Sequence, residues 1–135
     1  METIINRAAV VVLLAFGLAG CGDNAQRQVE QTVRGHLNDP DSARFSDVEV
    51  IDKGRLVCGQ VNAKNAFGGY VGDRTFMIWD GTTRIASSDL ESLQLSTCCI
   101  STRHAVMLRK DTAEIDGFDS ACRRFGVAPF NWKRD

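Results

Sequence analysis

Cysteine is the residue type here with the widest choice of chemistry, because a thiolate can act as a nucleophile, a metal ligand or half of a disulfide. The 135 residues include two histidines and five cysteines, which are Cys21, Cys58, Cys98, Cys99 and Cys122. No pair has the C-x-x-C spacing of redox enzymes, and the sequence has no G-x-S-x-G, H-E-x-x-H or P-loop motif. The sequence therefore indicates no catalytic residue, no resident metal and no cofactor.

Cys21 follows a segment that is typical of an export signal. Arg7 supplies a positive charge, and the run from Ala8 to Gly20 contains only apolar residues and glycine. A membrane-spanning helix needs roughly 20 apolar residues, so this shorter run fits the apolar core of a signal peptide better. We expect residues 1–20 to be removed and residues 21–135 to form one small domain on a very short tether.

Leu18, Ala19, Gly20 and Cys21 together resemble the lipobox of bacterial lipoproteins. In that family the cysteine receives a thioether-linked diacylglycerol, the signal is cut just before it, and the new amino terminus is acylated, commonly with palmitate. The resemblance implies a domain anchored through Cys21 in the bacterial envelope and facing the periplasm. Gly22, where aspartate would favour inner-membrane retention, favours the outer membrane. The alternative is an ordinary secretory signal cut near Ala19 and Gly20.

Export changes the interpretation of the other four cysteines, because disulfides persist in oxidising compartments. Adjacent α-carbons lie about 3.8 Å apart, below the usual disulfide range of about 4.4 Å upward, which disfavours a bond between Cys98 and Cys99. Cys58 would then pair with one of these two and Cys122 with the other. Two alternatives remain: a single Cys58–Cys122 bridge, or a metal site that combines Cys98, Cys99 and His104.

Helical spacing of apolar residues occurs at both ends of the exported chain. Val29, Val33 and Leu37 predict an amphipathic helix over residues 24–37, which Pro40 ends. Four residues near the carboxyl end predict a second helix: Ile115, Phe118, Cys122 and Phe125. Between the two, the apolar pattern changes to that of strands.

Four segments predict antiparallel strands: residues 45–51, 55–63, 74–80 and 82–87. Ser88 and Glu91 match a capping box that opens a short helical turn. The apolar runs 94–100 and 104–108 predict further short strands. The expected fold class is α+β, with an amino-terminal helix, a small antiparallel sheet of three to five strands and a carboxyl-terminal helix on one face.

A two-part pattern, DP-x-SA-x-F followed by CG-x-VN-x-KN and GGY-x-G, occupies residues 39–45 and 58–72. It resembles the pattern of small, functionally uncharacterised envelope lipoproteins and phage-associated proteins of bacteria. The resemblance implies a shared small fold and no established activity.

The second half of this pattern predicts a glycine-rich hairpin loop, in which Gly68, Gly69 and Gly72 allow positive φ. Amide side chains of Asn62 and Asn65 could hydrogen-bond the loop backbone, while Lys64 and Tyr70 could contact a partner or glycan. The loop is either a purely structural hairpin or an exposed binding site. The candidate binding residues are Asn62, Lys64, Asn65, Gly68, Gly69 and Tyr70.

The charge balance excludes an obvious nucleic-acid partner, because 16 Lys and Arg residues face 17 Asp and Glu residues. We expect a lipid-anchored, non-enzymatic envelope protein that binds another envelope protein or a cell-wall component. The alternatives are a periplasmic enzyme that uses the glycine-rich loop and a protein inhibitor of a cell-wall hydrolase.

Overall fold

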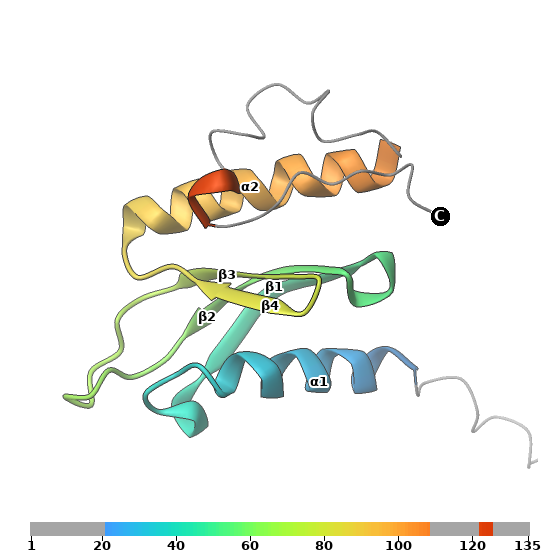
Figure 1. Cartoon of the computed structure of the whole chain (residues 1–135). Helices are drawn as coiled ribbons and strands as arrows, with labels where there is room; N and C mark the ends of the chain where they lie inside the picture. Colours follow the sequence, from blue (N-terminus) through green and yellow to red (C-terminus); the bar gives the residue numbers. More distant parts are fainter. Residues whose placement is uncertain (1–20, 109–121, 126–135) are drawn as a thin grey trace, which may run out of the picture.

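The computed structural model describes residues 21–108 and 122–125, in which two helices cover opposite faces of one sheet (Figure 1). The helices are α1 (Cys21–Arg34) and α2 (Asp89–Leu108). The strands are β1 (Arg44–Ile51), β2 (Leu56–Asn62), β3 (Arg74–Trp79) and β4 (Thr82–Ile85). The sheet is antiparallel in the order β1-β2-β3-β4, so each strand pairs with its neighbour in the chain. Short 3₁₀ turns occur at Pro40–Ser42, Asp52–Gly54 and Arg123–Phe125.

The α+β class and the antiparallel sheet agree with the sequence prediction, and the four strand boundaries lie within two residues of it. The predicted carboxyl-terminal helix lies largely outside the described residues, as does the signal peptide. Within the described ranges, no helix is long and apolar enough to cross a membrane.

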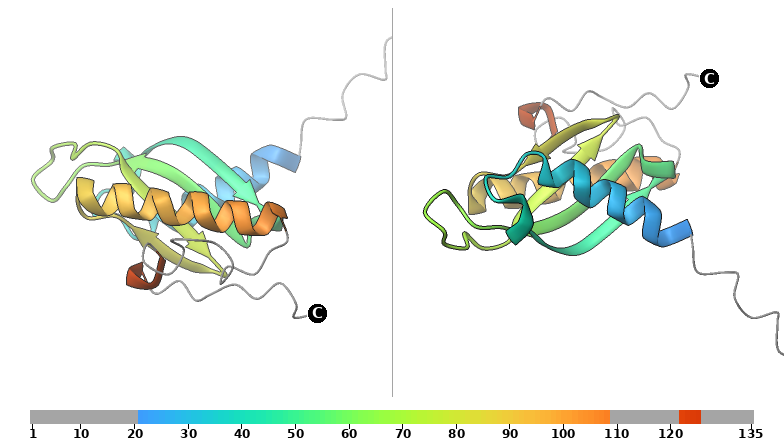
Figure 2. Two further views of the ribbon diagram at one scale, coloured as in Figure 1. Left: turned by 90° about the horizontal axis from the view of Figure 1, so that it is seen from above. Right: turned by 90° about the horizontal axis from the view of Figure 1, so that it is seen from below.

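Most side chains of the central strands β2 and β3 are buried. Because successive side chains of a strand point to opposite sides of the sheet, both faces of these strands must be covered. Leu56 and Met77 pack against α2 in one core cluster, together with Leu95. Val57 and Phe76 belong to the other cluster, against α1. The sequence predicted the carboxyl-terminal helix on one face, whereas among the described residues α2 covers one face of the sheet and α1 covers the other (Figure 2).

The prediction of short strands at residues 94–100 and 104–108 was wrong, because both runs belong to the continuous helix α2. The inner face of α2 buries six residues at helical spacing: Leu95, Cys98, Cys99, Thr102, Ala105 and Val106. Its outer face also carries apolar side chains, including Leu93, Ile100 and Met107, which are more than half exposed. Apolar residues on both faces hide the helical period and leave runs that look like strands.

The predicted start of this helix is confirmed at Ser88 and Glu91, although the helix is 20 residues long rather than a short turn. The Ser88 hydroxyl accepts a hydrogen bond from the Glu91 amide at 3.2 Å. The Glu91 carboxylate accepts hydrogen bonds from the hydroxyl and the amide of Ser87, and these bonds lower the pKa of Glu91. The negative charge thus lies in the first turn, where it complements the helix dipole.

At Gly59 the backbone of β2 packs directly against the aromatic ring of Phe76. A Cβ atom built there would lie 2.6 Å from Cζ and 2.7 Å from Cε1 of Phe76, which is the register partner of Gly59 on β3. Phe76 is fully buried, and Phe45 packs edge-on against its ring with centroids 6.0 Å apart. The ring therefore occupies the space that any other side chain at position 59 would need.

We expect Gly59→Ala to lower the free energy of unfolding by about 1–3 kcal/mol, because the added methyl group overpacks the core beside Phe76. Gly69→Ala is the matched control, since its Cβ would meet no atom closer than 3.9 Å and Gly69 has no positive φ. Urea denaturation of the three proteins measures the difference. Equal losses in the two variants would contradict the role assigned to the ring.

Candidate functional site

The loop of residues 63–73, between β2 and β3, projects from the end of the molecule opposite to the start of α1 (Figures 1 and 2). The turn at Asp52–Gly54, between β1 and β2, lies at the other end of these strands. The candidate binding residues predicted from the sequence lie in the loop of residues 63–73, apart from Asn62, which is the last residue of β2.

Backbone and side-chain hydrogen bonds hold the tip of the loop in one shape. The Asn65 side-chain oxygen accepts hydrogen bonds from the amides of Phe67 (3.0 Å) and Gly69 (3.2 Å). The Asn65 backbone amide donates to the Gly69 carbonyl at 2.9 Å, and Lys64 pairs with Tyr70 as an isolated antiparallel bridge. Asn65 thus makes the loop-closing bonds expected of it.

Two details of the loop differ from expectation. Gly68 and Gly72 have positive φ, at 82° and 88°, but Gly69 does not; its backbone amide donates to the Asn65 side-chain oxygen instead. Asn62 makes no bond to the loop amides. Its side-chain oxygen is buried and finds no hydrogen-bond partner in the part of the chain that the structure describes.

The two halves of the sequence pattern meet at Ser42. Its hydroxyl donates to the Asp39 carbonyl and accepts from the Lys64 amide, both at 2.9 Å. The Tyr70 hydroxyl donates to the Ser42 carbonyl at 3.4 Å. The turn after Pro40 therefore braces the base of the loop, although Ser42 and Lys64 are 22 positions apart in the sequence.

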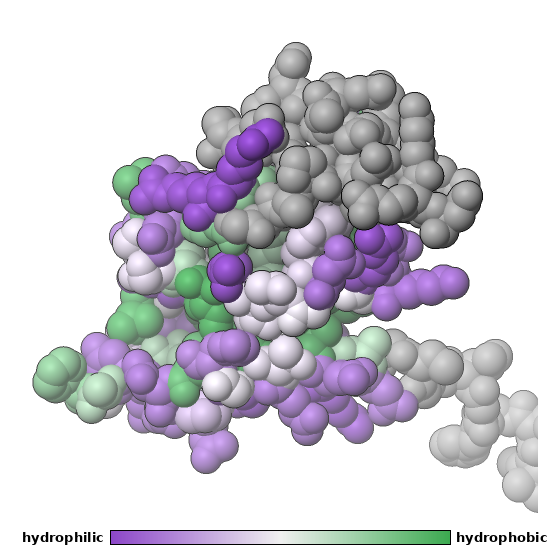
Figure 3. Space-filling model, in the orientation of Figure 1, coloured by the Kyte–Doolittle hydropathy of each residue, from purple (hydrophilic) through white to green (hydrophobic). Residues whose placement is uncertain are grey.

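Two cationic side chains lie against the Tyr70 ring, and two apolar side chains of the loop are exposed. The Arg44 guanidinium lies 4.5 Å and the Lys64 ammonium 5.6 Å from the centroid of the Tyr70 ring. Phe67 is 97% exposed and Val71 is 43% exposed. Figure 3 shows hydrophobic surface at the outer end of this loop. Arg44 and Phe67 were not among the predicted binding residues, and the position of Arg44 on the neighbouring strand becomes visible only in the fold.

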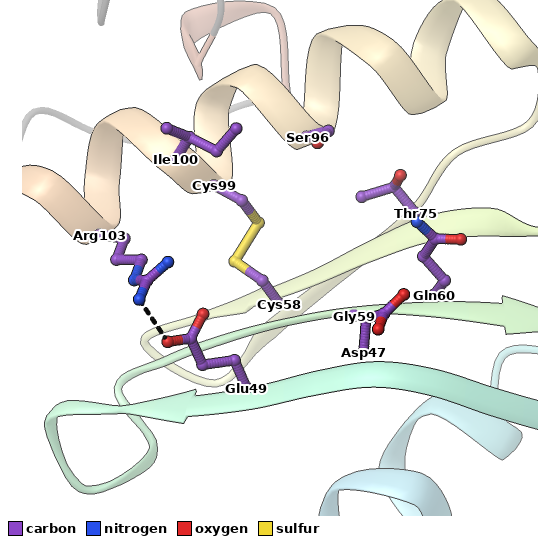
Figure 4. Close-up of a pocket in the computed structure, with 10 residues that line it drawn as sticks. All are labelled: Asp47, Glu49, Cys58, Gly59, Gln60, Thr75, Ser96, Cys99, Ile100 and Arg103. Atoms are coloured by element: carbon purple, nitrogen blue, oxygen red, sulfur yellow. Dashed lines mark ion pairs between the residues drawn. A yellow bond between two sulfur atoms is a disulfide. The ribbon is translucent and has the colours of Figure 1, made fainter.

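A second candidate site is a partly open pocket of about 140 Å³ between α2 and the sheet (Figure 4). An ion pair of 3.0 Å joins Glu49 on β1 to Arg103 on α2 beside the Cys58–Cys99 disulfide. A neighbouring pocket of about 380 Å³ shares Gln60, Thr75 and Ser96 with it. Nothing in the sequence predicted the 140 Å³ pocket, because its walls come from β1, β2, β3 and α2, which only the fold brings together. Ten residues line it: Asp47, Glu49, Cys58, Gly59, Gln60, Thr75, Ser96, Cys99, Ile100 and Arg103.

The structure contains the two disulfides, and it decides which cysteines pair. Cys58 is bonded to Cys99 with α-carbons 6.1 Å apart, and Cys98 to Cys122 with α-carbons 5.0 Å apart. A single Cys58–Cys122 bridge is therefore wrong. The metal site with His104 is excluded as well, since both of its cysteines are in disulfides, and the described residues hold no cluster of metal-ligating side chains.

Comparison with models of protein families, with curated proteins and with solved structures finds no match to this chain. The resemblance of residues 18–21 to a lipobox and the resemblance of the two-part pattern to envelope lipoproteins therefore stay predictions from the sequence.

We expect Ser42→Ala to lower the free energy of unfolding by about 1–2 kcal/mol, because the Lys64 amide loses its acceptor. Hydrogen exchange at that amide should become faster in the variant. Ser46→Ala, at an exposed position of β1, is the control and should leave both quantities unchanged. Unchanged exchange at Lys64 in Ser42→Ala would mean that Ser42 does not brace the loop.

Proposed function

We propose that this protein is a lipid-anchored, non-enzymatic binding module of the bacterial envelope. A lipid on Cys21 would hold it in a membrane, the outer in preference to the inner, with the domain in the periplasm. Residues 63–73 would contact another envelope protein or a cell-wall component.

The observation that carries the binding proposal is an almost fully exposed aromatic side chain on a braced loop. Phe67 is 97% exposed, so its side chain adds little to the hydrophobic core, whereas its burial in a complex would contribute about 1.5–3 kcal/mol. The Asn65 hydrogen bonds already order the backbone around it. A loop that is ordered before binding loses less conformational entropy in the complex, and aromatic side chains are frequent binding hot spots.

The position of the loop supports the same proposal. Helix α1 has 14 residues and spans about 21 Å from its first residue, Cys21. The loop lies at the end of the molecule opposite to that residue (Figure 1). An acyl anchor on Cys21 would therefore leave Phe67 on the side away from the lipid, where a periplasmic partner could reach it.

The enzyme alternative has less support from the geometry of the same residues. Lys64 lies beside the Tyr70 ring, and Tyr70 bonds to the Ser42 carbonyl. Neither side chain lines either of the pockets along α2. An inhibitor of a cell-wall hydrolase would be a special case of the binding proposal, with the loop as the inserted segment.

For the anchor, we expect the protein extracted from bacterial membranes to lack residues 1–20 and to carry acyl chains on residue 21. Two or more chains hold a protein stably in a bilayer, at about 0.8 kcal/mol per buried methylene. Intact-mass spectrometry measures both changes, and Cys21→Ala should release or misprocess the protein. A wild-type protein without lipid would refute the anchor and leave the binding role of the loop open.

For the loop, we expect a photoreactive residue in place of Val71 to crosslink a discrete partner in cells. Phe67→Ser should abolish this product with the thermal midpoint unchanged, because Phe67 is almost fully exposed. Mass spectrometry of the product distinguishes a protein from a glycan. The control position is Lys53, an exposed residue at the opposite end of β2. Equal products from both positions, or a product that survives Phe67→Ser, would refute binding through the loop.

A further inference from the structure

The two disulfides differ in how far solvent can reach them. Cys98 and Cys122 are both 0% exposed. The Cys98 sulfur packs 3.8 Å from the Met77 sulfur, and the Thr102 hydroxyl lies 3.7 Å from the Cys122 sulfur. A thiol in solution therefore cannot reach this bond unless the core opens.

The Cys58–Cys99 disulfide, by contrast, forms part of the wall of the 140 Å³ pocket (Figure 4). Cys58 is half-buried, in the middle of β2, and Cys99 is 6% exposed. Cavities of about 150 Å³ in proteins hold molecules the size of benzene. The pocket is thus large enough for a thiol of a few heavy atoms and too small for a folded protein.

We propose that Cys58–Cys99 is a site of thiol–disulfide exchange with small thiols, and that Cys98–Cys122 is a structural bond that does not exchange in the folded protein. Access and the thiolate fraction of the attacking thiol govern the rate of such exchange. The pocket provides the access for one disulfide, and the packing around Met77 denies it to the other.

Complete reduction of the Cys58–Cys99 disulfide consumes two molecules of the small thiol. The thiolate of the first attacks one sulfur of the Cys58–Cys99 bond, which breaks to give a mixed disulfide and one cysteine thiolate. The thiolate of the second attacks the small-molecule sulfur of the mixed disulfide and releases the other cysteine thiolate. Each cysteine thiolate takes up one of the protons that the two thiols lost. The small thiols are oxidised to their disulfide as the protein bond is reduced to two thiols.

The charges around the pocket favour a thiol with a cationic group. Asp47 and Glu49 both line it, against one cation, Arg103. Arg103 is already paired with Glu49 at 3.0 Å, so the carboxylate of Asp47 is the charge in excess. Asp47 has a φ of 51° at the bulge where the register of β1 with β2 shifts, and bulges often redirect a side chain.

Cysteamine, 2-mercaptoethanol and 2-mercaptoethanesulfonate provide a cationic, a neutral and an anionic probe of similar size. The oxidised protein is incubated with each at equal thiolate concentration without denaturant, then alkylated, digested and mapped by mass spectrometry. We expect the Cys58–Cys99 disulfide to be reduced at least roughly tenfold faster than Cys98–Cys122, because reduction of the latter requires the core to open first. Reduction of both disulfides at one common rate, or of Cys98–Cys122 first, would overturn the proposal.

Two further measurements test the pocket itself. Ile100→Trp enlarges a residue that lines the pocket and should slow the exchange, whereas Met107→Trp, elsewhere on the exposed face of α2, should not. Equal rates in the two variants would overturn the pocket as the route. Cysteamine should react fastest at low salt, and Asp47→Asn should reduce its advantage. Equal rates for the three thiols would overturn the preference for a cation.

Discussion

The pairing of β2 with β3 is the interaction on which the rest of this molecule depends. These strands lie at the centre of the sheet, and each buries one set of side chains under α1 and the other under α2. Their close approach requires glycine at position 59, because the ring of Phe76 fills the space beside it. The exposed loop joins the ends of the same two strands, and Cys58 of β2 holds α2 through its disulfide. Loop, pocket and helix therefore take their positions from one strand pair.

The two candidate sites differ in kind as well as in position. The loop projects from the molecule, and its backbone is bonded to itself and to Ser42, so the exposed Phe67 side chain stands on an ordered backbone. The pocket is concave, contains charges of both signs and borders a disulfide. A braced, projecting loop suits contact with a macromolecule, whereas a small polar cavity suits a small molecule. The fold can support both without conflict, because neither Lys64 nor Tyr70 lines the pocket.

Local patterns predicted well the elements in which local chemistry decides the structure. Apolar alternation and turn residues placed all four strands, and Ser88 and Glu91 marked the start of α2. The length of α2 was not predicted, because Leu93, Ile100 and Met107 make its outer face apolar too. The function of Asn65 in the loop followed from residue type, since a side-chain amide readily closes a turn. Its neighbour Asn62 lies in β2, where burial leaves its oxygen without a partner among the described residues.

By itself, the sequence determined the strand order along the chain, the turns between the strands and the small set of cysteine pairings that geometry allows. The tertiary structure decided which pairing occurs. Successive side chains of a helix point about 100° apart, so Cys99 faces β2 and reaches Cys58 while Cys98 packs beside Met77 and reaches Cys122. It also decided that one bond lies beside a pocket and the other in the core. Exposure depends on how distant segments pack, and no local pattern of residues contains that information.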